Sequence, residues 1–546
     1  MKKVLFLLLL FVVQATTTKA QTHPNIIFVL IDDAPMRLIF GDSLSSGRAG
    51  IDSLRTRGAT VTGYTASGLC TPSRASMHTG LYPASHGAVD NSSSIRSNLM
   101  FFQDALAGAG YNVNVVGKTY NTAVKKARDG VNKQISIKII DFKDPFFFKK
   151  NGNKFQIFGH TTQIISDTAL SWLSNIATLP EPFYIWTGKQ SPHAPPTPTP
   201  KNKNLYENLN FPLPANFDRF TNDYPDFLYS IPGKYHNPED TGKLKTTIRK
   251  SHETIADISD FIIEVRELLR SQGRLENTAI ILMSDNGYQF GEHSIKGKNS
   301  PYEGSIRIPC IIEYHPLFEG GTTIPYTGFN SVDVGATILD LANVSDTNFD
   351  NQSIGISLFD LMENPRDTLP LLKYKIGSAE DDDSDTLSPS FRGLRTPDFK
   401  YVKYHCDSLT EELFDLVNDP EENTNEIRNP AYATVVAHFR ARLPEVMAEI
   451  NDTMSIDTVL RPCKLITTGS KLDLSETSGP RISVFPNPAS EKITMIGINE
   501  GETIELYSIL GVHLGTFRND EFDVSSLPDG PYVLKLDGKN TMFIKQ

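Results

Sequence analysis

Acidic and amide side chains follow two strongly apolar runs of the chain. Asp32 and Asp33 come directly after one run, and Asp285 and Asn286 follow the other with a single serine between. These side chains offer only oxygen ligands, which favour a hard cation such as Ca²⁺ or Mg²⁺ over zinc. One aspartate at a strand end is usually a turn or helix-cap residue, but two clusters at two strand ends favour a metal site.

A candidate nucleophile and a candidate anion-binding group occur together in Cys-Thr-Pro-Ser-Arg at 70–74. The chain has four cysteines and no CxxC pair, which excludes a disulfide-dense scaffold and a zinc or iron-sulfur site of that kind. At least one cysteine is therefore free for chemistry, and Cys70 is the candidate. The pattern alone does not decide its role.

Two lysines and a histidine supply further polar groups. A lone lysine is usually solvated and a lone histidine usually structural, so only the motif gives such residues a role. The motifs are Gly-Lys at Lys118, Pro-His-Ala-Pro around His193, and a second Gly-Lys at Lys298 ahead of Tyr-Glu-Gly.

The elements that must position these residues form an α/β pattern. From about 22 to 390, short apolar runs alternate with helical periodicity, which predicts a mostly parallel central sheet flanked by helices. A helix is expected from Ile248 to Leu269, ended by Gly273. Ligands of such sheets lie outside the carboxyl ends of the strands, so four polar loops are expected to meet there. The apolar runs that lead into these loops are 25–31, 111–116, 183–186 and 279–283.

These motifs, in this order, resemble the formylglycine-dependent sulfatase family over about 22 to 465. The resemblance implies that Cys70 is oxidised to formylglycine (3-oxoalanine) by a maturation enzyme before export. It also implies one bound Ca²⁺ per chain. The implied ligands of the ion are Asp32, Asp33, Asp285, Asn286 and the modified Cys70.

The resemblance implies a mechanism as well. One hydroxyl of the hydrated aldehyde attacks sulfur and displaces the alcohol, the other then loses its proton, and sulfate leaves by elimination. Cationic groups should stabilise the charge that develops on the sulfate oxygens. Arg74, Lys118 and Lys298 match the family's aldehyde- and sulfate-binding bases, and His193 with Lys298 would hold or protonate the leaving oxygen.

One residue departs from the family pattern. The family usually has Gly-Lys-x-His where this chain has Gly-Lys-Thr-Tyr, so Tyr120 replaces the histidine that assists elimination. Tyrosine has a pKa of about 10 and is a poorer base near neutral pH. The hypothesis is that Tyr120 orients the aldehyde hydrate and that breakdown of the sulfated enzyme is slow or uses another base.

The expected organisation has five parts. An N-terminal pair of lysines, ten apolar residues and a polar end are typical of a secretory signal, and the apolar run is too short to span a membrane. Residues after the acidic stretch 380–385 change to an α+β pattern, and the last segment has short alternating strands. The predicted parts are a signal peptide at 1–20, a catalytic α/β domain at 21–390, a smaller α+β subdomain at 391–465, a linker at 466–480 and an all-β module at 481–546.

The last module carries a second resemblance, to the sorting domain of the type IX secretion system of Bacteroidota. Val-Phe-Pro-Asn-Pro at 484–488 and Leu-Pro-Asp-Gly-Pro-Tyr at 527–532 carry it. It implies passage through the periplasm and release to the cell surface or the medium. The competing interpretation, a carbohydrate-binding β-sandwich, normally needs a longer segment.

Composition limits the partners. The chain has 546 residues and a net charge of -11, which argues against nucleic acid and requires a locally positive pocket for any anion. No run is long enough for a transmembrane segment. Once Cys70 is converted, Cys310 is expected to be a buried apolar residue, and Cys406 with Cys463 is the expected disulfide.

The insertion at 191–240, rich in proline and aromatic residues, has two interpretations: a stiff cover packed on the sheet, or an aromatic wall for a sugar chain. The expected function is a secreted sulfatase acting on a sulfated glycan. Two alternatives remain, a phosphodiester or phosphonate monoester hydrolase of the same superfamily and a glycan-binding pseudo-sulfatase.

Overall fold

A computed structural model describes most of the chain. The described residues are 23–41, 44, 46–119, 128–137, 142–217, 238–293, 295–374, 390–405, 411–453 and parts of 483–545. The predicted signal peptide and linker, Tyr120, Cys406 and Cys463 all lie outside them. Among the described residues, no helix is both long and apolar enough to cross a membrane.

A ten-stranded, mostly parallel sheet forms the centre of the described catalytic region. Its strand order is β12-β2-β11-β8-β1-β7-β3-β4-β5-β6. The four middle strands β8, β1, β7 and β3 are parallel to one another, which confirms the expected fold class. The strands are β1 (Asn25–Ile31), β2 (Ala59–Tyr64), β3 (Asn112–Lys118), β4 (Lys133–Ile137), β5 (Phe146–Lys149), β6 (Lys154–Gln156), β7 (Phe183–Gly188), β8 (Thr278–Ser284), β11 (Arg307–Glu313) and β12 (Thr322–Thr323).

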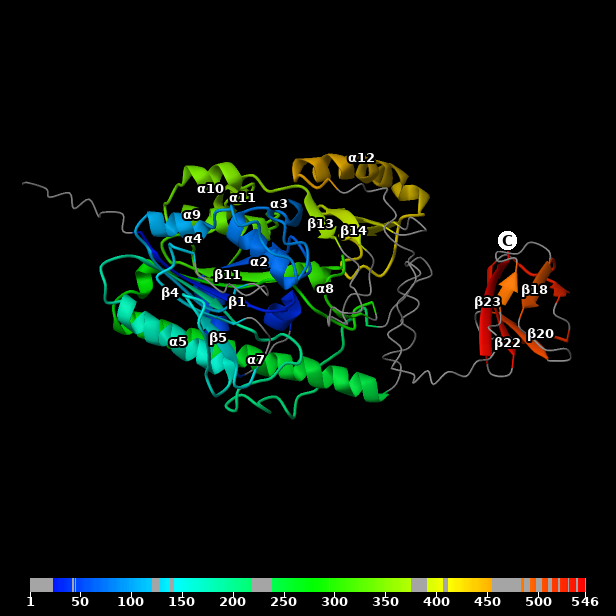
Figure 1. Ribbon diagram of the computed structural model, residues 1–546, viewed down its shortest axis with the longest axis horizontal. Helices are drawn as coiled ribbons and strands as arrows, with labels where there is room; N and C mark the ends of the chain where they lie inside the picture. The colour runs from blue at the N-terminus through cyan, green and yellow to red at the C-terminus, as the bar shows by residue number, and fades with distance from the viewer. Residues whose placement is uncertain are drawn as a thin grey trace, which may run out of the picture. The chain divides into compact units, whose positions relative to one another are not determined.

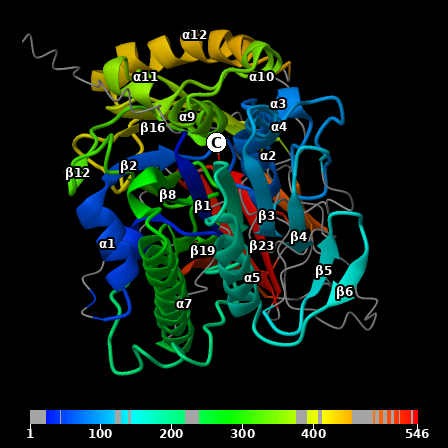
Figure 2. The same ribbon diagram turned by 90° about the vertical axis from the view of Figure 1, so that its left-hand side faces the viewer.

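Helices cover both faces of the sheet (Figures 1 and 2). One layer contains α1 (Ala49–Arg57), α5 (Thr161–Ile176) and α7 (Pro238–Ser271), and α7 includes the helix predicted from Ile248 to Leu269. The opposite layer contains α2 (Cys70–Thr79), α4 (Phe102–Gly108), α9 (Val334–Leu341), α10 (Thr347–Gln352) and α11 (Leu358–Glu363).

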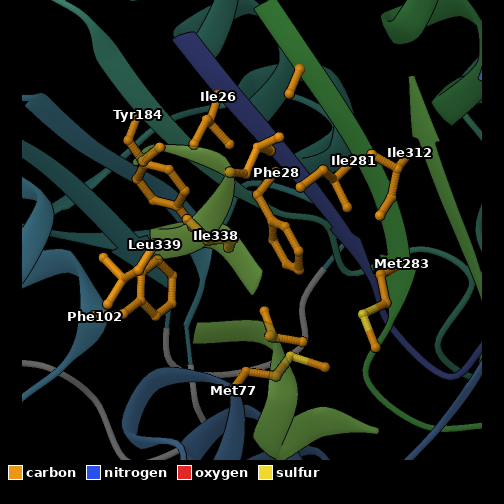
Figure 3. Packing of buried hydrophobic residues seen from close by; sticks show 14 of the residues in the cluster. Ile26, Phe28, Met77, Phe102, Tyr184, Ile281, Met283, Ile312, Ile338 and Leu339 are labelled. Carbon is orange, nitrogen blue, oxygen red and sulfur yellow. The ribbon is translucent and has the colours of Figure 1, made fainter. Parts of the chain in front are cut away.

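The alternation of side chains along β1 explains the two layers. Ile26 and Phe28 pack toward α2, α4 and α9, whereas Ile27 and Val29 pack toward α1, α5 and α7. Figure 3 shows the first of these cores, in which Phe28 lies among residues of neighbouring strands and helices. A strand buried on both faces needs a continuous apolar run, which is what the sequence of β1 provides.

A smaller antiparallel sheet with one helix follows the main sheet. It consists of β13 (Leu369–Lys373), β14 (Phe391–Arg395), β15 (Phe399–Tyr404) and β16 (Glu411–Asp415), and α12 (Ala433–Glu449) packs on it. Strand β13 precedes the predicted boundary at 390 but pairs with β14 along its whole length. The sheet therefore begins earlier in the chain than the change in sequence pattern indicates.

The chain divides into two compact units, Met1–Ile466 and a C-terminal unit, Thr467–Gln546. The C-terminal unit contains two small antiparallel sheets around its own apolar cluster, in agreement with the expected all-β module. Its strands are β17 (Ser483–Phe485), β18 (Lys492–Ile496), β19 (Ile504–Ser508), β20 (His513–Phe517), β21 (Glu521–Asp523), β22 (Gly530–Leu536) and β23 (Lys539–Lys545).

The described part of the aromatic insertion, 191–217, packs as a cover. Tyr206 and Phe211 are buried against Leu244 and Ile248 of α7, so these two rings are not a wall open to a ligand. Residues 218–237 of the insertion lie outside the described part of the chain. Cys310 is buried within β11, as expected for a small apolar residue.

Two glycines let β3 and β7 approach closely at the carboxyl edge of the sheet. Gly117 and Gly188 face each other across the two strands. A Cβ atom on Gly188 would lie 1.7 Å from the carbonyl oxygen of Lys118, a separation that no real contact allows. The Lys118 backbone can therefore occupy this position only because residue 188 is glycine and has no Cβ atom.

Replacement of Gly188 tests this constraint. We expect Gly188→Ala to lower the free energy of unfolding by about 1–3 kcal/mol, the usual cost of overpacking. The control is Gly108→Ala at the end of α4, where a Cβ would meet no atom within 4 Å. Chemical denaturation of both variants measures the difference, and equal stabilities would contradict the prediction.

Candidate active site

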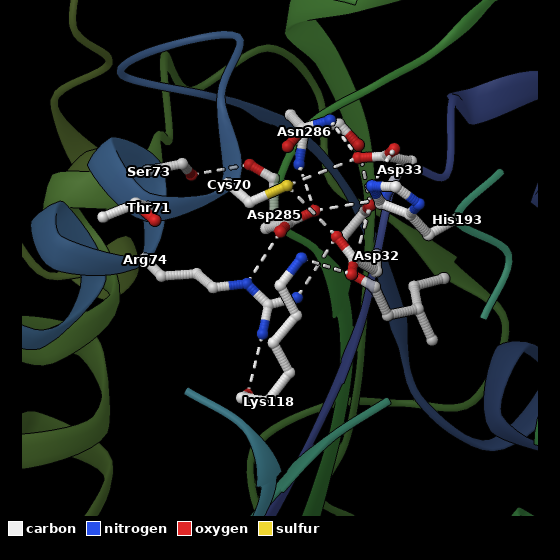
Figure 4. A network of polar contacts seen from close by, with 12 residues as sticks. Asp32, Asp33, Cys70, Thr71, Ser73, Arg74, Lys118, His193, Asp285 and Asn286 are labelled. Carbon is white, nitrogen blue, oxygen red and sulfur yellow. Dashed lines mark hydrogen bonds and ion pairs between the residues drawn. The ribbon is translucent and has the colours of Figure 1, made fainter. Parts of the chain in front are cut away.

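Four loops at the carboxyl ends of β8, β1, β7 and β3 meet around Cys70 (Figure 4). Asp32 and Asp33 leave β1, Lys118 ends β3, and His193 lies in the loop after β7. Consecutive residues of a strand point to opposite faces, yet both aspartates enter the site. A left-handed turn at Asp33, with a φ of 65°, makes this possible, and aspartate tolerates that conformation better than most residues.

Cys70 lies fully buried in the first turn of α2. Its Sγ atom is 3.3 Å from Oδ1 of Asp32 and 2.9 Å from Nζ of Lys298. Burial and the negative charge of Asp32 raise the pKa of the Cys70 thiol well above its usual value. The unmodified side chain is therefore a protonated thiol and a poor nucleophile.

The carboxylates form one candidate cation site. Ligand atoms of Asp32, Asp33, Cys70 and Asp285 all lie within 4.8 Å of one another. Asn286 donates its Nδ2 amide to Asp33 Oδ1 at 2.7 Å, and its buried Oδ1 has no hydrogen-bond partner among the described residues. A buried acceptor of this kind beside three carboxylates fits a hard cation.

Arg74 connects the parts of the site. Its Nε donates to Asp285 Oδ2 at 2.7 Å and its Nη1 donates to the carbonyl oxygen of Lys118 at 2.8 Å. Its Nη2 lies 3.5 Å from Asp32 Oδ1. One guanidinium group thus connects residues at or just after the ends of three strands, β8, β3 and β1.

Each cation has a carboxylate partner. Lys118 Nζ donates to Asp32 Oδ2 at 2.6 Å, and Lys298 Nζ donates to Asp33 Oδ1 at 2.7 Å. Burial alone would raise the pKa of Asp32, but Lys118 and Arg74 outweigh it and hold that pKa far below its usual range. The carboxylate therefore stays charged although it is buried.

His193 is the most accessible member of the group, with a side chain 17% exposed. Its Nε2 lies 3.4 Å from Asp33 Oδ2, and its Nδ1 lies 2.7 Å from the carbonyl oxygen of Ala194. The structure thus brings together all the described residues that the sequence singles out. His193 therefore lies on the side of the site that is open to solvent.

Two supporting residues escaped the sequence analysis. Ser73 Oγ donates to the backbone carbonyl oxygen of Asp285 at 2.6 Å, and Trp186 Nε1 donates to that of Lys118 at 3.2 Å. Ser73 lies within the Cys-x-Pro-x-Arg motif, and its position there was the available signal. Nothing in the sequence distinguishes Trp186 from other apolar strand residues.

A hollow of about 300 Å³ adjoins the site. Residues that follow Asp33 form one wall, and Gly304, whose backbone lies against Gly287, forms another. The charged groups of the lining are two arginines and four glutamates: Arg37, Arg307, Glu292, Glu303, Glu421 and Glu422. Ligand pockets for small molecules begin at about this size.

Hard-cation ligands and buried cationic donors around one side chain define an enzyme that acts on an anionic ester. Family models identify it further: a sulfatase model matches residues 24–344, and a model for the C-terminal part of N-sulphoglucosamine sulphohydrolase matches 291–449. The chain belongs to the sulfatase family and is a sulfuric ester hydrolase. Residues 483–546 match a secretion system C-terminal sorting domain.

Known proteins resemble almost the whole catalytic region. An N-acetylglucosamine-6-O-sulfatase of Bacteroides thetaiotaomicron is 26% identical, over 82% of this chain and 90% of that protein. A solved structure in complex with its substrate D-glucosamine-2-N,6-O-disulfate has a TM-score of 0.68 at 24% identity, over 80% of this chain and 99% of that one. A phosphonate monoester hydrolase of Agrobacterium radiobacter has a TM-score of 0.63 at 17% identity, over 78% and 96%.

Removal of the central arginine should destabilise the fold as well as the site. Arg74→Met leaves the buried carboxylate of Asp285 without its cationic partner, so we expect the free energy of unfolding to fall by about 3–5 kcal/mol. Arg55→Met is the control, because exposed Arg55 makes only surface contacts, an ion pair with Asp52 and a cation–π contact with Phe40, and its loss should cost about 0–1 kcal/mol. Similar denaturation midpoints for the two variants would contradict the predicted role.

Proposed function

We propose that this sulfatase removes sulfate from a sulfated polysaccharide or its oligosaccharides outside the cell, using formylglycine made from Cys70 and one bound Ca²⁺. The observation that carries the proposal is the environment of Cys70. Its Sγ marks the place of an aldehyde oxygen, 2.9 Å from Lys298 Nζ and 3.3 Å from Asp32. As a thiol, the same side chain faces Asp32 and Asp33, whose pKa values are held low by neighbouring cations, so both are weak bases for its activation.

Conversion of Cys70 breaks its Cβ–S bond and forms a C=O bond. With water as the oxygen source, hydrogen sulfide leaves, and two electrons and two protons pass to an acceptor used by the maturation enzyme. In its hydrated form, the aldehyde supplies an oxygen nucleophile for sulfur and a second hydroxyl whose deprotonation releases sulfate.

The residues fit a calcium ion. Asp32, Asp33, Asp285 and the free Oδ1 of Asn286 would hold it, together with the oxygen at residue 70. When bound, the cation would polarise that oxygen and balance the charge of the sulfate group. No soft sulfur or imidazole ligand is needed once Cys70 is converted.

The side chains of the site divide the remaining work. Lys118 and Lys298 provide ammonium groups for the sulfate oxygens, and Arg74 fixes Asp285 and lies beside Asp32, the carboxylate partner of Lys118. His193, whose side chain is 17% exposed, would protonate the alcohol oxygen that leaves. Tyr120 is proposed to orient the aldehyde hydrate.

The substrate class rests on the relatives and on the hollow beside the site. The relative from Bacteroides thetaiotaomicron acts on 6-O-sulfated N-acetylglucosamine by its name, and a similar structure holds a disulfated glucosamine. The hollow of about 300 Å³, one wall of which begins two residues after Asp33, offers space for a sugar ring. A C-terminal sorting domain supports export through the periplasm to the surface or the medium.

A phosphonate or phosphodiester hydrolase is the second candidate, because a phosphonate monoester hydrolase shares the fold. We expect faster turnover of 4-nitrophenyl sulfate than of bis(4-nitrophenyl) phosphate. Mass spectrometry of exported protein should find the aldehyde at residue 70, and Cys70→Ala should reduce turnover at least about a hundredfold.

The contrary outcomes separate the alternatives. An intact thiol in fully active protein would overturn the formylglycine mechanism. Faster phosphodiester turnover would favour the second candidate. An aldehyde without turnover of any sulfate ester would favour the pseudo-sulfatase that the substitution at Tyr120 keeps open.

Calcium is tested by removal and return. After treatment with a chelator, Ca²⁺ at a hundredfold excess over its Kd should stabilise the protein by about 2.7 kcal/mol, and turnover should return. Asp285→Asn should weaken both effects, whereas Asp398→Asn, at an exposed turn, should leave them unchanged. Thermal melting measures the stability. A melting temperature that does not change when Ca²⁺ is added would contradict the proposal.

A further inference from the structure

The hairpin of β5 and β6 ends the central sheet at the side of β3 and β4 (Figure 2). Phe147 packs in the core below the sheet, with Phe155 and Ile157 partly buried against it. Alternation along each strand turns the intervening residues to the other face. We call these residues the hairpin surface: Phe146, Phe148, Lys154, Gln156 and Phe158.

The hairpin surface leaves aromatic rings in solvent. Phe158 is 77% exposed, the highest value for a large apolar side chain among the described residues, and Phe146 is 46% exposed. Lys154 Nζ lies 3.9 Å from the centre of the Phe146 ring. Exposed apolar side chains that form a patch, unlike isolated ones, can mark an interaction surface.

The charge of the hairpin differs from that of the protein. Residues 143–160 contain four lysines and one aspartate in a chain with a net charge of -11. The carboxylate of Asp144 accepts a hydrogen bond from the backbone N–H of Gly159 at 2.7 Å, so it is already engaged in holding the turn. The hairpin is therefore a local positive region on an acidic protein.

The hairpin is continuous with the catalytic edge of the sheet. β5 and β6 lie two and three strands beyond β3, so β6 is about 14 Å from the strand that carries Lys118. His160, directly after the hairpin, lies with Nε2 3.0 Å from the carbonyl oxygen of Thr197, in the loop that also carries His193. A chain molecule bound at His193 can reach the hairpin along this loop.

We propose that the hairpin surface is a second binding site for the sulfated glycan chain, outside the site of hydrolysis. Pyranose rings present C–H faces that pack on exposed aromatic rings, and Lys154 is opposite in charge to the sulfate groups. β6 is also the edge strand of the described sheet, so its outer backbone groups can bind sugar hydroxyls. This inference rests on the proposed polysaccharide substrate and adds where the polymer is held.

The test compares a polymer with a single sugar. The probes are heparin, chemically desulfated heparin and the monosaccharide D-glucosamine-2-N,6-O-disulfate, with the full chain in its matured form. Phe146→Ser with Phe158→Ser, and separately Lys154→Gln, should weaken heparin binding about tenfold, the order expected for loss of exposed aromatic and cationic contacts. Monosaccharide turnover and the melting temperature should not change.

Matched controls alter the same residue types elsewhere. Leu317→Ser removes an exposed apolar side chain at the opposite end of the sheet, and Lys250→Gln removes an exposed lysine of α7. Both should bind heparin like the unaltered protein. Desulfated heparin should bind weakly to all variants, because the charge match is lost.

Several results would overturn the inference. One is heparin binding by the hairpin variants equal to that of the controls. Another is a change only in self-association on light scattering, which would show that the lysines protect an edge strand. Sulfate release from the monosaccharide tests the proposed function separately, so normal release with unchanged heparin binding would remove this inference alone.

Discussion

Three buried carboxylates and three buried cations occupy one small volume, and each carboxylate lies 2.6–2.7 Å from a cationic nitrogen. Burial of any one of them alone would cost several kcal/mol, so the set is stable only when complete. Before any ligand binds, the charges nearly cancel. Such a neutral set can take up a divalent cation and an anionic ester together more easily than either alone. The groups are Asp32, Asp33, Asp285, Arg74, Lys118 and Lys298.

The rest of the fold holds this set in place. Parallel strands buried on both faces give rigid ends, and α2 brings the cysteine and the arginine to those ends from the helical layer. The carbonyl oxygen of Lys118 accepts hydrogen bonds from both Arg74 and Trp186, and Gly188 makes room for it. Precision at the site thus comes largely from backbone positions.

The sequence predicted the fold class and the residues that meet at the site, because strand ends and short motifs are local signals. It did not predict that β13 joins the small sheet, since the pairing with β14 crosses a long segment without a pattern. It also missed Trp186, whose indole N–H donates a hydrogen bond to the carbonyl oxygen of Lys118, a residue distant in the sequence. The sequence analysis also missed the hairpin surface. In strands as short as β5 and β6, the alternation of apolar and polar residues is too brief to be distinguished from the pattern of a loop.

Burial of Cys70 has a consequence for the order of events in the life of the protein. Two of the segments that enclose it, at 32–33 and 285–286, are separated by some 250 residues of chain, and the cysteine is completely covered once they meet. A maturation enzyme cannot reach a covered side chain. The proposed conversion of residue 70 would therefore have to occur while the later half of the sheet is still missing or unfolded, and a molecule that folds before it would keep its thiol.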